Sequence, residues 1–281
     1  MPEEITTLIH KYLRHDKKFP HVWCPGCGNG IVLGSIIRAI DKLGLEKDNI
    51  VLVSGIGCSG RMPVYVDVNT LHTTHGRALT FATGVKLAKP SLNVIVVMGD
   101  GDATAIGGNH FIHAARRNIN LTAIIINNHI YGMTGGQHSP TTPYGNYAST
   151  SPYSNIEHSF DIAELAVTSG ASFVGRGTVY HVQLLAGLME KAIQKRGFSV
   201  VEVRANCHVQ FGRRNNMSDA VTMMQWFKDN AIKIENAAKM TPKELEDKFT
   251  IGILTDIHKP IYTQEYEKIL QKAQLRKETK K

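Results

Sequence analysis

An acidic residue between two glycines follows the most apolar run of the chain. Gly99-Asp100-Gly101 comes directly after Val94–Met98, which we predict to be a buried strand. The glycines let the backbone approach a ligand and leave the Asp100 carboxylate free to bind a cation. A second polar motif, Asn127-Asn128, ends the next apolar run, Leu121–Ile126. Because ligands of open α/β sheets bind at the carboxyl ends of strands, both motifs are candidate parts of a site.

The spacing of the two motifs brings them together. Between Gly101 and Asn127 lie 25 residues, enough for one helix and one strand, so Asp100 and Asn128 are expected side by side at one edge of the sheet. Carboxylate, amide and backbone carbonyl oxygens form a set of ligands suited to Mg²⁺, which takes its other ligands from phosphate and water. We therefore predict a magnesium–diphosphate site. The alternative, in which Asp100 caps a helix and the asparagines form a turn, explains each motif singly but not their joint placement.

Together the motifs resemble the thiamine diphosphate motif shared by transketolases, decarboxylases and 2-oxoacid oxidoreductases. In that family the motif aspartate, the last asparagine and the carbonyl oxygen two residues later bind Mg²⁺. The resemblance implies Asp100, Asn128 and Ile130 as the ligands here. It also implies contacts to the diphosphate and thiazolium from Gly101, Asp102, Gly132 and Met133.

Four cysteines form a second candidate site. Cys24 and Cys27 make a C-x-x-C pair, while Cys58 and Cys207 each follow a predicted strand. Four are too few for a disulfide scaffold, and we expect the reducing cytoplasm. By their spacing they suit one Cys₄ [4Fe–4S] cluster, a zinc site, or buried or redox-active thiols.

The thiamine motif and the cysteines together resemble the β subunit of 2-oxoacid:ferredoxin oxidoreductases, over about residues 20–215. In that family these four cysteine positions hold a [4Fe–4S] cluster. The resemblance also implies that Ile56, Gly57, Cys58 and Ser59 line the thiamine site. It places His75 beside the cofactor, where a polar turn is the alternative. The segment 133–143 most resembles the branch acting on 2-oxoglutarate.

The activity that the resemblance implies is reversible oxidative decarboxylation of 2-oxoglutarate to succinyl-CoA and CO₂, with coenzyme A as co-substrate and electrons passed through the cluster to ferredoxin. Thiamine enzymes generally take an activating glutamate from a separate pyrimidine-binding domain. This chain accounts for only one doubly wound domain, the one with the Asp100/Asn128 motif, and not for a pyrimidine-binding domain as well. An obligate α subunit is therefore expected to supply that glutamate, and no catalytic residue is assigned here. The alternatives are pyruvate or branched-chain substrates, a non-redox thiamine decarboxylase, and a non-catalytic iron–sulfur or zinc module.

One further glycine motif, residues 55–60, matches the G-x-G-x-x-G pattern of nicotinamide sites. Such a site needs a helix next and an acidic residue about 20 positions on. Pro63 follows instead, and residues 70–90 contain no Asp or Glu. We therefore exclude nicotinamide binding.

The elements that would position these residues alternate between strands and helices. Strands are expected at 49–54, 93–98, 121–126 and 198–204, and helices at 28–43, 77–88, 105–117, 160–169 and 181–195. Such alternation is typical of an α/β fold with a doubly wound, mostly parallel sheet. Residues 131–155 form a long loop, which in a compact domain is usually functional.

Composition limits the remaining possibilities. The chain has 281 residues and a net charge of +8, which suits a solvated surface, an acidic partner or phosphate-bearing ligands. It contains no nucleic-acid-binding motif, no run of about 20 apolar residues that could cross a membrane, and no secretory signal. We expect a polar arm at 1–20, an α/β domain at 21–218, and a helical extension with a basic tail at 219–281.

Overall fold

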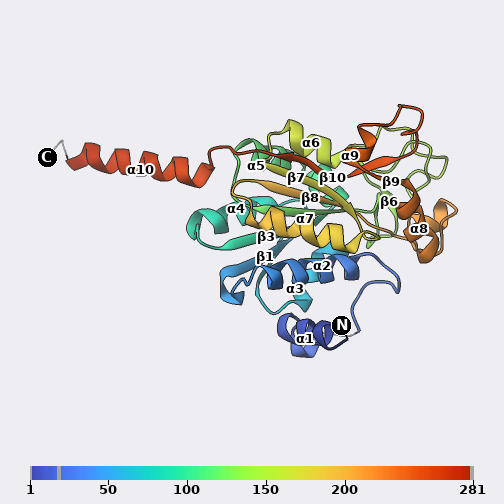
Figure 1. Ribbon diagram of the computed structural model, residues 1–281, viewed down its shortest axis with the longest axis horizontal. Coiled ribbons are helices and arrows are strands. Elements are labelled where there is room, and N and C mark those ends of the chain that lie inside the picture. Colours follow the sequence, from blue (N-terminus) through green and yellow to red (C-terminus); the bar gives the residue numbers. More distant parts are fainter. Residues whose placement is uncertain (1, 18–19, 279–281) are drawn as a thin grey trace.

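The computed structural model describes residues 2–17 and 20–278. Its centre is a sheet in the order β2-β1-β3-β4-β8-β7-β10-β9 (Figure 1). The strands of this sheet are β1 (Ile50–Ser54), β2 (Asn69–His72), β3 (Asn93–Gly99), β4 (Thr122–Asn127), β7 (Phe173–Thr178), β8 (Ser199–Arg204), β9 (Ala231–Lys233) and β10 (Phe249–Asp256). Neighbouring strands are parallel except β10 and β7, which are antiparallel. A small hairpin joins β5 (Ile130–Tyr131) to β6 (Gln137–His138).

Helices cover both faces of the sheet. The α-helices of the described residues are α1 (Pro2–Tyr12), α2 (Asn29–Lys42), α3 (Met62–Tyr65), α4 (Ala78–Ala88), α5 (Gly108–Arg116), α6 (Ile162–Thr168), α7 (Val182–Gln194), α8 (Ala220–Asn230), α9 (Ile234–Ala237) and α10 (Tyr262–Glu278). Helices α2 and α7 pack on one face, and α4, α5 and α6 on the other. Helix α10 extends away from the body of the molecule (Figure 1).

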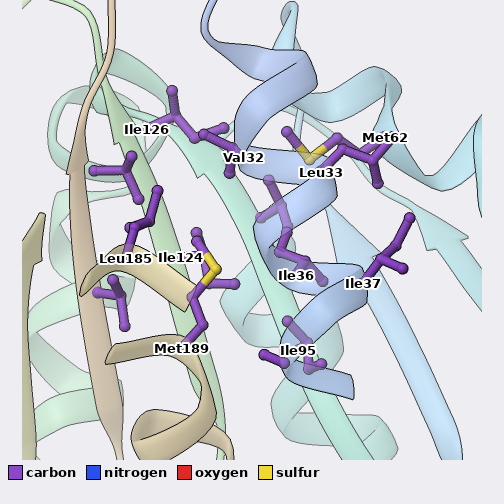
Figure 2. Close-up of a cluster of buried hydrophobic side chains, with 14 of the residues drawn as sticks. Val32, Leu33, Ile36, Ile37, Met62, Ile95, Ile124, Ile126, Leu185 and Met189 are labelled. Carbon is purple, nitrogen blue, oxygen red and sulfur yellow. The ribbon is translucent and has the colours of Figure 1, made fainter. Parts of the chain in front are cut away.

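The central strands β1, β3 and β4 are mostly apolar because both of their faces are buried. In β3, Ile95 and Val97 point toward α2 and α7, whereas Val94 and Val96 point toward α4 and α5. Figure 2 shows the first of these layers, in which side chains of β3 and β4 meet those of α2 and α7. This packing confirms the predicted doubly wound fold, with its mostly parallel sheet.

The structure departs from the predicted elements at several places, among them the following three. The helix expected at 105–117 begins earlier, with π-helical residues Asp102–Ile106, and continues as α5. Strand β7 was missed because its sequence, FVGRGT, interrupts the apolar run with two glycines and an arginine. The expectation of only helices and charge after residue 219 was wrong for β10, which adds an antiparallel strand beside β7.

Both ends of the chain are helical where they are described. The polar N-terminal arm contains α1, and Tyr12 and Leu13 at its end are buried in the core. The expected basic tail is largely α10. The three-part division of the chain stays a prediction. Among residues 2–17 and 20–278, no helix has the length and apolar character needed to span a membrane.

Candidate functional site

A cavity of about 200 Å³ opens beyond the carboxyl ends of β1, β3 and β4. Strands β2 and β3 lie on opposite sides of β1. The strand order therefore reverses at β1, as it does at the ligand crevice of doubly wound sheets. Most of the residues selected from the sequence line this one cavity. They are Ile56, Gly57, Cys58, Ser59, His75, Asp100, Gly101, Asp102, Asn128, Ile130, Gly132 and Met133.

Asp100 lines the cavity and is 2% exposed. Its Oδ2 atom accepts hydrogen bonds from the hydroxyls of Ser139 (2.5 Å) and Thr141 (2.6 Å). Burial raises the pKa of Asp100, and the two hydroxyls oppose that rise. Because a buried carboxylate needs a compensating charge, this position suits a cation ligand.

Asn128 and Ile130 border the same cavity from the end of β4. Parallel pairing of Gly99 with Ile126 brings the ends of β3 and β4 level, which explains why Asp100 and Asn128 are neighbours. The Asn128 Oδ1 atom accepts a bond from the Ile130 amide at 3.3 Å. In the described ranges, no three His, Cys, Asp or Glu side chains surround a metal position. Of the three predicted Mg²⁺ ligands, only Asp100 is of these residue types. This absence therefore does not bear on the Mg²⁺ site, which remains a prediction.

The buried Asp102 and the partly exposed His75 form a polar pair beside Asp100. The Asp102 Oδ1 atom accepts a hydrogen bond from the Gly76 amide at 2.6 Å and lies 2.5 Å from Nδ1 of His75. Among the described residues, its Oδ2 atom is buried without a hydrogen-bond partner. Burial raises the pKa of Asp102, and the Gly76 amide and His75 oppose this. A buried oxygen without a partner is rare, and here it adjoins a cavity that a polar ligand could enter.

Glycines bring backbone and side chains close together around the cavity. A methyl group at Gly101 would overlap the ring of Tyr131, whose hydroxyl donates to the Gly101 carbonyl at 3.1 Å. A methyl group at Gly55 would overlap the Asp102 carboxylate. These two glycines are therefore required by packing, and Gly101 also leaves its backbone open to the cavity.

The four cysteines lie near enough to interact electrostatically, and Cys58 lines the cavity, but among the described residues no three of them surround a metal position. All are free thiols, with Cys24 exposed and the other three partly buried. A Cβ atom at Gly132 would lie 3.5 Å from Sγ of Cys207 and 3.8 Å from Sγ of Cys58. Burial, together with the charges of the other cysteines, raises the pKa of Cys58 to about 12. Deprotonation of such grouped thiols requires a positive partner such as iron or zinc.

Comparison with known proteins agrees with this geometry. Residues 55–203 match the family described as thiamine pyrophosphate enzyme, C-terminal TPP binding domain. The 2-oxoglutarate synthase subunit KorB of Methanothermobacter marburgensis is 53% identical over 250 residues, covering 89% of this chain and 87% of that protein. The 2-oxoacid:ferredoxin oxidoreductase subunit beta of Saccharolobus solfataricus is 41% identical, covering 83% and 76%. This chain belongs to the β subunits of the 2-oxoacid:ferredoxin oxidoreductase family.

The structural comparison extends over nearly the whole β subunit. A solved structure, 2-oxoglutarate:ferredoxin oxidoreductase from Magnetococcus marinus with 2-oxoglutarate, coenzyme A and succinyl-CoA bound, superposes with a TM-score of 0.83 at 33% identity. The match covers 94% of this chain and 90% of that one. The predicted family and its likeness to the 2-oxoglutarate branch are thereby confirmed, and the chain is an oxidoreductase subunit.

The β subunit also contains a buried charged network that the sequence analysis missed. Glu202 is fully buried in β8, 2.7 Å from Nε of Arg176 and 3.0 Å from Nε of Arg204. Against the effect of burial, Arg204 and Arg176 lower the pKa of Glu202 to about 2. Asn127 donates to Glu202 at 2.8 Å and lies 2.9 Å from the Thr141 hydroxyl. A glutamate within the apolar run of β8 was the signal that could have revealed it.

Proposed function

We propose that this β subunit binds thiamine diphosphate and Mg²⁺ in the cavity and one [4Fe–4S] cluster at the four cysteines. Its complex would convert 2-oxoglutarate and coenzyme A to succinyl-CoA and CO₂ and pass the electrons to ferredoxin. The observation that carries this proposal is the position of Cys58 and Gly132. Both line the cavity, and Gly132 lies beside Cys58 and Cys207, so the two sites share a wall.

The residues around the cavity fit the cofactor chemically. Asp100, Asn128 and the Ile130 carbonyl would bind Mg²⁺, because they offer the hard oxygens that this ion prefers. The backbone at Gly101 would lie against the diphosphate, and the Oδ2 atom of Asp102, which has no hydrogen-bond partner among the described residues, would meet a polar group of the cofactor. Further contacts would come from Ile56, Gly57, Ser59, Gly132 and Met133. When bound, thiamine diphosphate supplies the nucleophilic carbon and the electron sink for decarboxylation.

The cysteine group fits a cluster for similar reasons. Cys27 donates its amide to the Cys24 carbonyl at 3.0 Å, which fixes the C-x-x-C turn. Trp23 Nε1 donates to the Cys58 carbonyl at 2.7 Å, which ties that turn to the edge of the cavity. When bound, a [4Fe–4S] cluster supplies an electron carrier ligated by four thiolates. The iron would provide the positive charge that the raised thiol pKa values call for.

A partner subunit is part of the proposal. The cavity of about 200 Å³ is smaller than the 300–1,000 Å³ or so of a typical ligand site, as expected if another chain encloses part of the cofactor. The acidic residues that line the cavity are Asp100 and Asp102. The activating glutamate of thiamine enzymes is therefore not among the described residues that line it. An α subunit would supply that glutamate. The net charge of +8 suits association with coenzyme A and an acidic ferredoxin.

The test is to purify the complex of this chain with its α subunit anaerobically and measure its spectrum and its substrates. We expect the broad visible absorption of an iron–sulfur cluster, and turnover of 2-oxoglutarate above pyruvate with coenzyme A as acceptor. Colourless protein containing zinc would contradict the cluster. The name of the Saccharolobus relative refers to 2-oxoacids in general, so pyruvate or another 2-oxoacid is the second candidate substrate. A tenfold or so preference for pyruvate would favour it.

A further inference from the structure

His129 lies between two of the proposed Mg²⁺ ligands, Asn128 and Ile130, in an unusual backbone conformation. Its φ angle is 64°, in the left-handed region that residues other than glycine seldom adopt. Its carbonyl accepts a bond from the Thr142 hydroxyl at 2.6 Å. Such a backbone conformation persists only where surrounding contacts hold it. Here it occurs in the chain between the two proposed ligands.

The imidazole ring of His129 is held on both sides. Its Nδ1 atom lies 2.6 Å from the Thr141 carbonyl, and its Nε2 atom lies 3.0 Å from Nη1 of Arg204. Because a carbonyl only accepts and a guanidinium only donates, Nδ1 carries the hydrogen and Nε2 accepts. Arg204 is in turn ion-paired with the buried Glu202. The ring thus connects a fixed charged network in the sheet to the loop above it.

The loop that contains Thr141 also forms a hydrogen bond with Asp100. The Thr141 hydroxyl is 2.6 Å from Oδ2 of Asp100, while the Thr141 carbonyl faces the His129 ring. His129 itself does not line the cofactor cavity. It faces a separate cavity of about 480 Å³, bordered by Phe211 and Trp226. Its ring therefore reaches the loop and the sheet but not the cofactor.

We propose that His129 is a positioning residue, which holds the Asn128 amide and the Ile130 carbonyl at the correct distance from Asp100 for Mg²⁺. This inference rests on the proposed function. It differs from a ligand role, because the ring bonds to Thr141 and Arg204 and His129 is not among the residues that line the cofactor cavity. Outer residues that orient metal ligands typically change metal affinity by about 10–100-fold when they are replaced.

The test uses the complex with the α subunit and the variant His129→Gly. Glycine accepts the left-handed backbone, so the substitution removes the ring without adding backbone strain. Calorimetric titration of Mg²⁺ at saturating thiamine diphosphate should show affinity about tenfold weaker or more. Added imidazole should restore much of it, since the neighbouring cavity gives access to the vacated space. The matched control is Asn216→Gly, an exposed residue with a φ of 59°, which should leave affinity unchanged.

Each outcome has a distinct meaning. If the unaltered complex shows no Mg²⁺-dependent binding of thiamine diphosphate, the proposed function fails. If it binds and His129→Gly binds Mg²⁺ equally well, the positioning role is overturned. If the Mg²⁺ affinity of His129→Gly is weakened but added imidazole does not restore it, the positioning role is also overturned, because loss of the ring would not be the cause. Should His129→Gly fail to fold by circular dichroism, His129→Asn also tolerates the left-handed backbone and lacks the ring, and the same weakening is expected.

Discussion

Oγ of Ser139 lies 2.5 Å from Oδ2 of Asp100, although 39 positions separate the two residues in the chain. The loop after β6 returns to the end of β3 and places a second hydroxyl, from Thr141, on the same oxygen. These donors favour the charged carboxylate and offset part of the cost of burying it. The loop therefore holds the residue proposed as the charged ligand of Mg²⁺.

Replacing Thr141 with Val removes one of these donors and keeps the shape of the side chain. We expect Mg²⁺ to bind the complex about tenfold more weakly or worse, because Asp100 loses an orienting bond. Thr83→Val is the control, since the Thr83 hydroxyl bonds only within α4, to the Leu79 carbonyl. Titration with Mn²⁺, followed by electron paramagnetic resonance, measures both variants. Equal affinity in the two would show that the loop does not orient the ligand.

Gly101→Ala tests the close packing of the cavity wall. The added methyl group would overlap the Tyr131 ring, and we expect a loss of about 1–3 kcal/mol in the free energy of unfolding. Gly108→Ala is the matched control, because a methyl group there meets nothing within 4 Å. It should be neutral or stabilising by up to about 1 kcal/mol. Urea unfolding of both variants decides the matter, and equal stabilities would contradict the packing described here.

Serine in place of Cys24, Cys27, Cys58 or Cys207 should each lower the iron content and the visible absorption of the complex, because a cluster would lose one thiolate ligand. Trp23 adds a local probe, since its indole is bonded to the Cys58 carbonyl. Its fluorescence should be quenched in the holoprotein and recover in the variants. A Trp226→Phe background removes the signal of the other tryptophan. Full iron content in three of the four variants would refute the assignment.

The buried Glu202 predicts a pH dependence of stability. Its pKa is lowered to about 2 from an ordinary value of 4.5, so its contribution is complete above pH 4.5 and is lost as the pH falls from there toward 2. Glu202→Gln should cost about 3–5 kcal/mol near pH 7, because Arg176 and Arg204 lose their partner. The difference between the two proteins should stay constant from about pH 7 to 5 and shrink below pH 4.5. Urea unfolding of both proteins across this pH range measures the difference in their free energies of unfolding. A difference that grows as the pH falls would contradict the lowered pKa of Glu202.

Part of this architecture could be predicted from the sequence because it depends on local pattern. The apolar runs Val94–Met98 and Leu121–Ile126 mark buried parallel strands, and parallel strands end at one edge, so Asp100 and Asn128 had to be neighbours. The roles of His129 and Ser139 could not be predicted, because they depend on where an irregular loop folds back. Strand β7 was hidden for a related reason, since Arg176 is tolerated there through its pairing with Glu202 on the next strand and with Asp161.

We propose that the cofactor cavity and the four cysteines act as one electron-transferring site. The most direct test adds 2-oxoglutarate, without ferredoxin, to the anaerobic complex loaded with thiamine diphosphate and Mg²⁺, and follows the cluster by electron paramagnetic resonance. We predict that the substrate produces the signal of a reduced cluster. In a complex bearing Asp100→Ala the iron should remain bound but the signal should be absent. A complex that contains both cofactors yet stays oxidised with 2-oxoglutarate, or an Asp100→Ala complex that is reduced equally fast, would contradict the account.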